Sequence, residues 1–161
     1  MAVYGIGATF KRKDYSKDFM ENGIAFISWS DSVASELHKF FQNIKIGDIF
    51  YIKSYNPSKG LTVKAAGIVS DNDVVKVFDA ESRKIITDAT DIDKVKEENK
   101  RMCLSVKWIW QGDNKTFIHY DPNMDKYNVR NVAIYEEFNE EVLEDVIDKI
   151  AMNIYKDPKK K

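Results

Sequence analysis

The spacing of apolar residues along this chain changes between the period of a helix and the period of a strand. Between residues 33 and 44 the apolar side chains fall at i, i+4, i+7, i+8 and i+11, which predicts an amphipathic helix. Between residues 102 and 110 they occupy alternate positions, which predicts a strand with one buried face. A last helix is predicted from Asn139, because Phe138 and Leu143 are spaced as a hydrophobic staple. Its expected buried stripe consists of Val142, Leu143, Val146, Ile147 and Ile150.

Turn-forming residues mark the limits of the remaining elements. Ser16 is the predicted N-cap of a helix over residues 17–22, and Gly23 is its predicted left-handed end. The loop 56–60 reads Asn-Pro-Ser-Lys-Gly, which predicts a hairpin between the apolar segments on either side of it. The other strands are expected over residues 3–10, 24–29, 49–55, 61–70, 74–78 and 115–120, the last as the neighbour of 102–110.

Residues 79–101 carry alternating acidic and basic blocks with few apolar positions. We expect them to form a charged peripheral insertion with a short helix. Because strands dominate the middle of the chain and helices lie early and late, we predict an α+β fold, a small and mostly antiparallel β-barrel flanked by helices. A single domain is expected over residues 1–156, followed by a frayed tail at 157–161.

Composition narrows the classes of protein to which the chain can belong. With 161 residues, of which 43% are hydrophobic, it can bury a core without a disulfide or a structural metal. Its net charge of −1 argues against strong non-specific nucleic-acid binding, which usually accompanies a basic domain. One cysteine (Cys103) and two histidines (His38 and His119) cannot supply the closely spaced pairs of ligands that a structural zinc site needs. We also expect no cofactor. Cys103 is expected to pack as a small hydrophobe, and the alternative is a nucleophile activated by His119.

The N-terminal segment does not have the order of a secretion signal. Residues 1–10 are largely apolar, but the basic residues 11–13 follow them, which reverses the arrangement of a signal peptide. No apolar run approaches the ~18 residues of a membrane-spanning helix. We therefore expect a soluble, cytoplasmic protein without a membrane partner.

Residues 24–70 contain several motifs in a recognisable order. Trp29, within Ile-Ser-Trp-Ser-Asp, precedes the amphipathic helix; Gly47-Asp48 then leads into an aromatic strand, and the return strand ends in Ala-Gly-Ile-Val. This order resembles the EVE-type domains of the PUA-like superfamily. The resemblance implies a small barrel that reads a modified base or nucleotide without catalysis. It also implies that Trp29, Lys53, Ser54 and Tyr55 lie in the ligand pocket.

The chain departs from the family pattern near these positions. Residues 30–32 are Ser-Asp-Ser, where family members often carry Arg or Asn just after the tryptophan. Residues 53–55 are Lys-Ser-Tyr in place of Tyr-His-Ser, and residues 3–7 differ from the usual Tyr-Trp-Leu-x-Lys opening. These departures affect the expected ligand more than the expected fold.

Three further residues are candidates for the same pocket. Ser28, next to Trp29, can donate a hydrogen bond to a ligand. Trp110 ends its strand beside a polar turn, where its ring can stack on a base. Arg130 can bind a phosphate or stack on a base, or instead pair with Asp125. Trp29 has an alternative role as a plug of the barrel core.

These observations predict non-enzymatic binding of a nucleobase, a nucleotide or a modified nucleic acid in an aromatic-lined pocket. Stacking and a few polar contacts are expected to supply the affinity, because the net charge is near zero. One alternative is a nucleotide- or RNA-processing enzyme that uses His119 or the pair Glu136 and Glu137; another is a dimerisation module built from the aromatic residues. A reader of this kind suits RNA modification, restriction of modified DNA or phage–host defence, as a monomer or homodimer.

Overall fold

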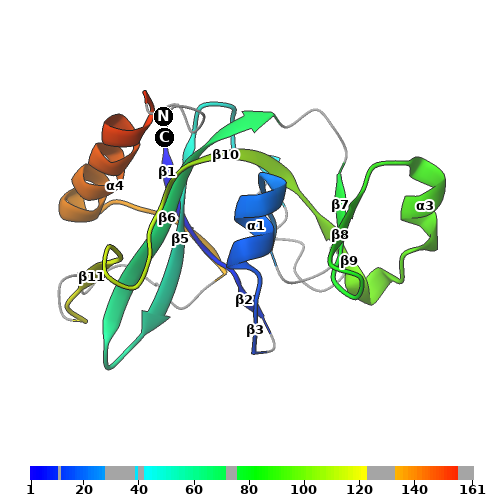
Figure 1. The fold of residues 1–161 in the computed structure, drawn as a ribbon, viewed down its shortest axis with the longest axis horizontal. Helices are drawn as coiled ribbons and strands as arrows, with labels where there is room; N and C mark the ends of the chain where they lie inside the picture. The colour runs from blue at the N-terminus through cyan, green and yellow to red at the C-terminus, as the bar shows by residue number, and fades with distance from the viewer. Residues whose placement is uncertain (11, 28–38, 40–41, 72–75, 123–132, 156–161) are drawn as a thin grey trace.

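A computed structural model describes residues 1–10, 12–27, 39, 42–71, 76–122 and 133–155 of the chain (Figure 1). Within these ranges the predicted α+β class is confirmed, with strands in the majority. None of the helices in these ranges is long and apolar enough to cross a membrane. Three predicted site residues, Ser28, Trp29 and Arg130, and most of the predicted helix 33–44 lie outside the described residues.

The main sheet of the described chain has seven strands and curls into a half-barrel (Figure 1). Its strands are β1 (Val3–Gly7), β4 (Ile24–Ala25), β5 (Ile49–Asn56), β6 (Gly60–Asp71), β10 (Leu104–Gln111), β11 (Ile118–Tyr120) and β12 (Ile134–Glu136). Six of them follow the order β12-β1-β5-β6-β10-β4, and β11 pairs with β6 outside this path. Among the described strands, β12 and β4 end the order without pairing with each other, so the sheet is open.

The predicted hairpin between residues 49–55 and 61–70 is confirmed. Strands β5 and β6 pair antiparallel, with Tyr55 opposite Leu61. The Asn56 side chain accepts hydrogen bonds from the N–H of Ser58 (2.9 Å) and from its hydroxyl (2.7 Å). Gly60 closes the loop with a φ of 93°, a conformation that favours glycine. The hairpin is thus specified by bonds among neighbouring turn residues.

Strand β1 runs parallel to β5, a pairing that the order of elements did not predict. The Asp48 carboxylate joins the starts of the two strands, because it accepts hydrogen bonds from the backbone N–H groups of Ala2 (3.0 Å) and Lys45 (2.8 Å). Gly47, with a φ of 93°, makes the turn before it. The Gly47-Asp48 pair therefore aligns β1 with β5 in addition to starting β5.

The predicted pairing of residues 115–120 with 102–110 is wrong. Strand β11 pairs instead with β6, along the same edge that β10 occupies: Gln111 of β10 is opposite Ala65, and Ile118 of β11 is opposite Val63. This arrangement is possible because β6 is twelve residues long and offers enough edge for both strands in succession.

The strict alternation predicted for residues 102–110 is interrupted. The segment divides into β9 (Lys100–Met102) and β10, and the pairing of β10 with β6 shifts register between Ser105 and Val106 and again between Trp108 and Trp110. A bulge moves the following side chains to the other face. Trp108 and Trp110, on either side of the second shift, pack in different cores. Ser105 is buried, whereas Met102, which belongs to β9, is 45% exposed. Of the predicted strand 24–29, residues 24–25 form β4, residues 26–27 are not in a strand, and residues 28–29 lie outside the described residues.

The first helix, α1 (Ser16–Asn22), ends at Gly23 in the predicted left-handed conformation, with a φ of 61°. Ser16 is its first residue rather than its N-cap. The carboxylate of Asp14 accepts hydrogen bonds from the N–H (2.8 Å) and the hydroxyl (2.6 Å) of Ser16, so Asp14 stabilises this end of the helix.

The C-terminal helix, α4 (Glu140–Asn153), begins as predicted after Asn139, whose side chain accepts a hydrogen bond from the N–H of Val142 (3.2 Å). Val142 lies in the predicted buried stripe together with Val146 and Ile150. Ile147 does not, because it is 38% exposed. Phe138 is also largely exposed, so the predicted staple contributes little burial.

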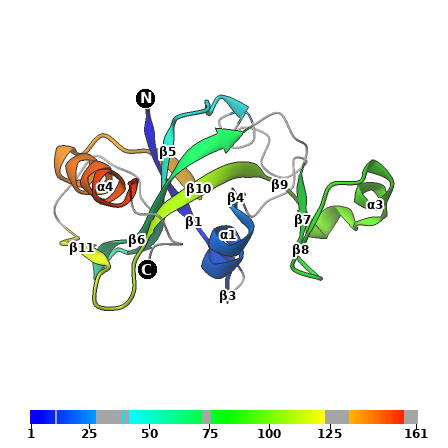
Figure 2. The same ribbon diagram turned by 45° about the horizontal axis from the view of Figure 1, so that its top comes forward.

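Strand β5 is buried on both faces, which explains its unbroken apolar run at residues 49–52. Phe50 and Ile52 belong to a first core, which includes Phe19 of α1. Ile49 and Tyr51 belong to a second core beneath α4. Figure 2 shows the two helices on opposite faces of the main sheet.

Two smaller sheets lie beside the first core. A hairpin is formed by β2 (Thr9–Phe10) and β3 (Lys13–Asp14), and a three-stranded sheet is formed by β7 (Val77–Asp79), β8 (Lys84–Ile86) and β9 in the order β8-β7-β9. The segment 79–101 contains the expected short helix, α3 (Ala89–Lys94), and a 3-10 turn at Glu97–Asn99. Its strands were not predicted, because each spans only three residues.

Candidate functional site

A cavity of about 640 Å³ lies between the β2–β3 hairpin and the loops of the three-stranded sheet. This volume falls within the ~300–1,000 Å³ that is typical of small-molecule sites. Residues from four separate stretches of the chain line it: 9–15, 26, 80–81 and 96–101. The cavity is therefore a product of tertiary packing.

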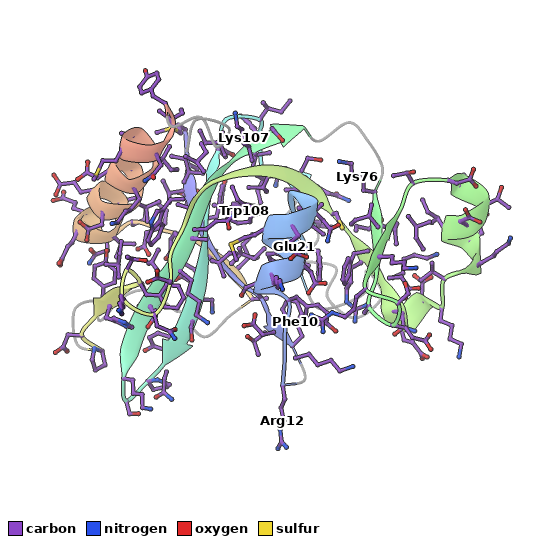
Figure 3. All side chains as sticks on the ribbon, viewed as in Figure 1. Phe10, Arg12, Glu21, Lys76, Lys107 and Trp108 are labelled. Atoms are coloured by element: carbon purple, nitrogen blue, oxygen red, sulfur yellow. The ribbon has the colours of Figure 1, made fainter. Side chains whose placement is uncertain are left out.

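The hairpin on one side of the cavity has a basic tip. Phe10 pairs with Lys13 across it, which leaves two residues for the turn. Arg12 in this turn has a φ of 67°, which is unusual for a residue other than glycine but is required in tight hairpin turns. Figure 3 shows Arg12 at the tip, pointing away from the rest of the molecule, while Phe10 lies at the base.

The loops on the other side are joined to each other. The backbone N–H of Ala80 donates a hydrogen bond to the carbonyl of Asn99 (2.8 Å), and the Asn99 side chain lies 3.4 Å from the carboxylate of Glu81. Arg83, in the turn after Glu81, pairs with Asp18 of α1 and also donates to the carbonyl of Asp14 (3.0 Å). These contacts hold the small sheet against α1 and the hairpin.

Three aromatic rings form one wall of the cavity. Phe10 and Tyr15 are stacked, with ring centroids 5.7 Å apart and an interplanar angle of 29°. Phe26 lies 5.7 Å from Phe10 and 5.8 Å from Tyr15. Tyr15 and Phe26 are buried, whereas Phe10 is only partly buried. The guanidinium of Arg83 lies 4.5 Å from the centroid of Tyr15, so Phe10 is the ring most accessible to a ligand.

Arg101 of β9 supplies a positive charge to the cavity. Its Nη1 donates hydrogen bonds to the carbonyls of Glu98 (2.7 Å) and Lys100 (3.2 Å). No carboxylate among the described residues forms an ion pair with it. Partial burial lowers the pKa of Arg101, and the nearby phenol of Tyr15 opposes this effect. A guanidinium remains charged at neutral pH, so the cavity contains a partly desolvated cation.

Four more charged residues line the cavity. Lys13 and Lys96 are basic and exposed, and Glu81 and Glu98 are acidic and exposed. Thr9 and Asn99 add neutral groups that can donate and accept hydrogen bonds. The arrangement suits a planar ligand that stacks on a ring and carries both polar edges and a negative group.

Four of the residues predicted for the pocket, Lys53, Ser54, Tyr55 and Trp110, are among the described residues, and none of the four lines this cavity. Lys53, Ser54 and Tyr55 follow one another along β5, on the main sheet. Lys53 lies over the ring of Tyr135, with Nζ 5.5 Å from its centroid, and Ser54 is exposed. Tyr55 packs against the second core. Their role in binding stays a prediction, separate from the cavity.

Trp110 belongs to the same second core against which Tyr55 packs. It is only 7% exposed, and the Nζ of Lys149 from α4 lies 5.0 Å from its ring centroid. Trp108, which the alternation favours as a core residue, packs against the first core and stacks on Phe19 with centroids 6.5 Å apart. Its Nε1 donates a hydrogen bond to the carbonyl of Ile24 (3.1 Å).

A buried group of hydroxyls and one carboxylate lies beneath α4. The hydroxyls of Tyr51 and Tyr135 are 2.6 Å apart, and the hydroxyl of Tyr51 donates to Glu137 (2.5 Å). Glu137 is 2% exposed and also accepts a hydrogen bond from the N–H of Asn139 (3.1 Å). Burial, together with the neighbouring Tyr135 and Glu137, raises the pKa of Tyr51 well above its ordinary value. The group fixes the start of α4 on the sheet.

The two candidates for a nucleophile pair, Cys103 and His119, lie in different parts of the fold. Cys103 packs against the first core next to β9, and His119 is exposed on β11. Figures 1 and 2 both draw β9 and β11 well apart, with the main sheet between them. The Nδ1 of His119 lies 3.0 Å from the hydroxyl of Thr62. Burial raises the pKa of the Cys103 thiol to about 12, so it is protonated at neutral pH. Cys103 and His119 therefore do not form a nucleophile pair.

The sequence reasoning missed Phe10, Tyr15, Phe26 and Arg101. A local signal existed for the first two, because a basic run at residues 11–13 separates them, and aromatic residues interleaved with basic ones are typical of nucleotide-binding surfaces. No pattern within residues 96–101 distinguishes Arg101 from its charged neighbours. Its significance depends on the cavity alone.

A comparison of the chain with models of known protein families finds no match. A comparison with curated proteins also finds no match.

Proposed function

We propose that the protein is a binding module that holds a nucleobase or nucleotide in this cavity and performs no chemistry on it. The observation that carries the proposal is the combination of a partly exposed ring, Phe10, with a guanidinium, Arg101, that no described carboxylate neutralises. Stacking on an aromatic ring contributes about 1–3 kcal/mol per base. A cation beside the ring suits the phosphate of a nucleotide.

The character of the lining supports binding rather than catalysis. The described lining residues include no histidine or cysteine, which are the commonest general bases and thiol nucleophiles. Their carboxylates, Glu81 and Glu98, belong to exposed residues, whereas general acids and bases usually lie in desolvated surroundings. Thr9 and Asn99 can read the edge of a base through hydrogen bonds.

The PUA-like assignment is part of the same proposal. It is supported by the turn at Gly47-Asp48, the β5–β6 hairpin and the curled sheet. In this proposal the half-barrel is a variant of the PUA-like barrel. The cavity beside the hairpin then differs in position from the pocket that the family resemblance implies at residues 53–55.

A titration tests the proposal. The common ribonucleosides and their 5′-monophosphates are added to the protein, and binding is followed by calorimetry and by amide chemical shifts. We expect the shifts to concentrate at residues 9–15, 80–81 and 96–101. Phe10→Leu keeps an apolar side chain but removes the π face, so it should weaken binding by about 5- to 150-fold, the equivalent of about 1–3 kcal/mol.

Phe138→Leu is the matched control, because Phe138 is exposed beside α4 and does not line the cavity. It should bind like the wild type. If neither nucleosides nor monophosphates bind the wild type at millimolar concentration, or if both variants bind equally, the cavity is not a base-stacking site.

A further inference from the structure

Arg101 lines the cavity and has N–H donors that make no hydrogen bond to the other described residues. A guanidinium carries five N–H donors, and the two hydrogen bonds that Arg101 donates within the described part of the chain both come from Nη1 and both end on backbone carbonyls. Carbonyl contacts orient the group but do not neutralise its charge. The remaining donors and the charge suit an anion with several oxygens, which a guanidinium binds in a fork-like geometry.

Two more cations lie on the same cavity from different directions. Lys13 comes from the hairpin and Lys96 from the segment that precedes β9, so with Arg101 they approach the cavity from both of its sides. A phosphate monoester carries a charge of about −1.5 to −2 at neutral pH. Three cations are sufficient for one such group.

The carboxylates of Glu81 and Glu98 limit how much negative charge the cavity accepts. The described lining has three positive and two negative side chains, so its net charge is +1. A polynucleotide brings a phosphate for every residue, and its affinity depends on a surface with many unopposed cations. One terminal phosphate close to Arg101 fits this balance better than a chain of phosphates.

We propose that the ligand of this cavity is a free mononucleotide, whose base stacks on Phe10 and whose phosphate is held by Arg101. Lys13 and Lys96 provide additional positive charge. This inference rests on the proposed function and goes beyond it, because it selects the phosphorylated and unpolymerised form of the ligand. The base edge faces the polar groups of Thr9 and Asn99.

The first experiment needs only the wild-type protein. Affinities are measured by calorimetry for a ribonucleoside, its 5′-monophosphate, inorganic phosphate and a short single-stranded RNA of mixed sequence. The monophosphate should bind about 10- to 100-fold more tightly than the nucleoside, as expected for charge-assisted hydrogen bonds. The RNA should bind more weakly than the monophosphate.

The second experiment uses two variants that remove the same charge. Arg101→Gln should abolish the preference for the monophosphate over the nucleoside, while binding of the nucleoside persists. Arg12→Gln is the control, because Arg12 is exposed at the hairpin tip and does not line the cavity. Should Arg101→Gln fail to fold, Lys96→Gln, at an exposed position, should reduce the same preference by a smaller factor.

The outcomes separate this inference from the proposed function. Equal affinity for nucleoside and monophosphate, or a preference that survives Arg101→Gln, overturns the phosphate assignment and leaves the base site in place. Tighter binding of the RNA, lost in Arg12→Gln, overturns the choice of a free mononucleotide in favour of a polymer. Failure of both nucleoside and monophosphate to bind contradicts the proposed function itself.

Discussion

Replacing Gly5 by alanine is expected to destabilise the fold strongly. Gly5 lies in β1, and an alanine Cβ at this position would be 2.6 Å from Cζ of Tyr135 and 2.7 Å from both the Tyr135 hydroxyl and Cζ of Tyr51. Carbon atoms in favourable contact are about 3.5–4.0 Å apart. Both rings are buried, so they cannot move aside without disturbing the second core.

The size of the effect follows from two costs. Forcing an extra methyl group into a packed core costs about 1–3 kcal/mol. Displacing Tyr51 also weakens its hydrogen bond to the buried Glu137, and a buried polar group left without its partner costs about 1–3 kcal/mol. We therefore expect Gly5→Ala to lower the free energy of unfolding by roughly 3–5 kcal/mol.

Urea unfolding followed by tryptophan fluorescence measures this loss, and a thermal scan should show a lower Tm by about 6–20 °C. Gly7→Ala in the same strand is the control. Its Cβ would meet Lys53 Cε at 3.6 Å, an ordinary contact, so its free energy of unfolding should stay within about 1 kcal/mol of the wild type. Equal stabilities of the two variants would refute the packing of the two tyrosines around Gly5.

Two further predictions concern stability. Burial raises the pKa of the Cys103 thiol from 9.0 to about 12, so the thiol ionises at a lower pH in the unfolded chain than in the folded one. Between these two pH values the free energy of unfolding of the wild type, relative to that of Cys103→Ala, should therefore fall by up to about 1.4 kcal/mol per pH unit. Urea unfolding at several pH values measures this difference, and parallel pH profiles of the two proteins would contradict the prediction. Gly60 and Gly47 both have a φ of 93°, but a Cβ at Gly60 would lie 1.9 Å from the carbonyl oxygen of Tyr120, whereas Gly47 faces open space. Gly60→Ala should therefore cost at least about 2 kcal/mol more than Gly47→Ala, and equal losses in thermal unfolding would show that backbone strain alone matters.

Elements with local signals could be predicted from the sequence. The loop 56–60 predicted the β5–β6 hairpin, Asn139 predicted the start of α4, and Gly23 predicted the end of α1. Each of these features depends on hydrogen bonds or backbone angles of residues only a few positions apart. The same reasoning failed at Ser16, because the neighbouring Asp14 offers a carboxylate that accepts the hydrogen bonds at the helix start.

Strand partners and exposure were decided by the tertiary structure. The parallel pairing of β1 with β5 and the pairing of β11 with β6 join segments that are distant in the chain, and no turn between them selects the partner. The alternation over residues 102–110 was misleading because the segment divides into β9 and β10, and because the register shift between Trp108 and Trp110 places these two rings in different cores. Periodicity describes a regular strand, and a bulge removes that regularity.

The candidate site could not be predicted from the sequence, because it is assembled by tertiary packing. Phe10 and Tyr15 come from the hairpin and its connection to α1, Phe26 follows β4, and Arg101 comes from β9, so no short motif contains them. An arginine in a charged segment is ordinary in the sequence. It becomes a candidate ligand-binding residue when packing partly buries it beside an aromatic wall and leaves its charge without a carboxylate in the described chain. Desolvation and missing partners are properties of the fold, since they depend on what surrounds a side chain in space.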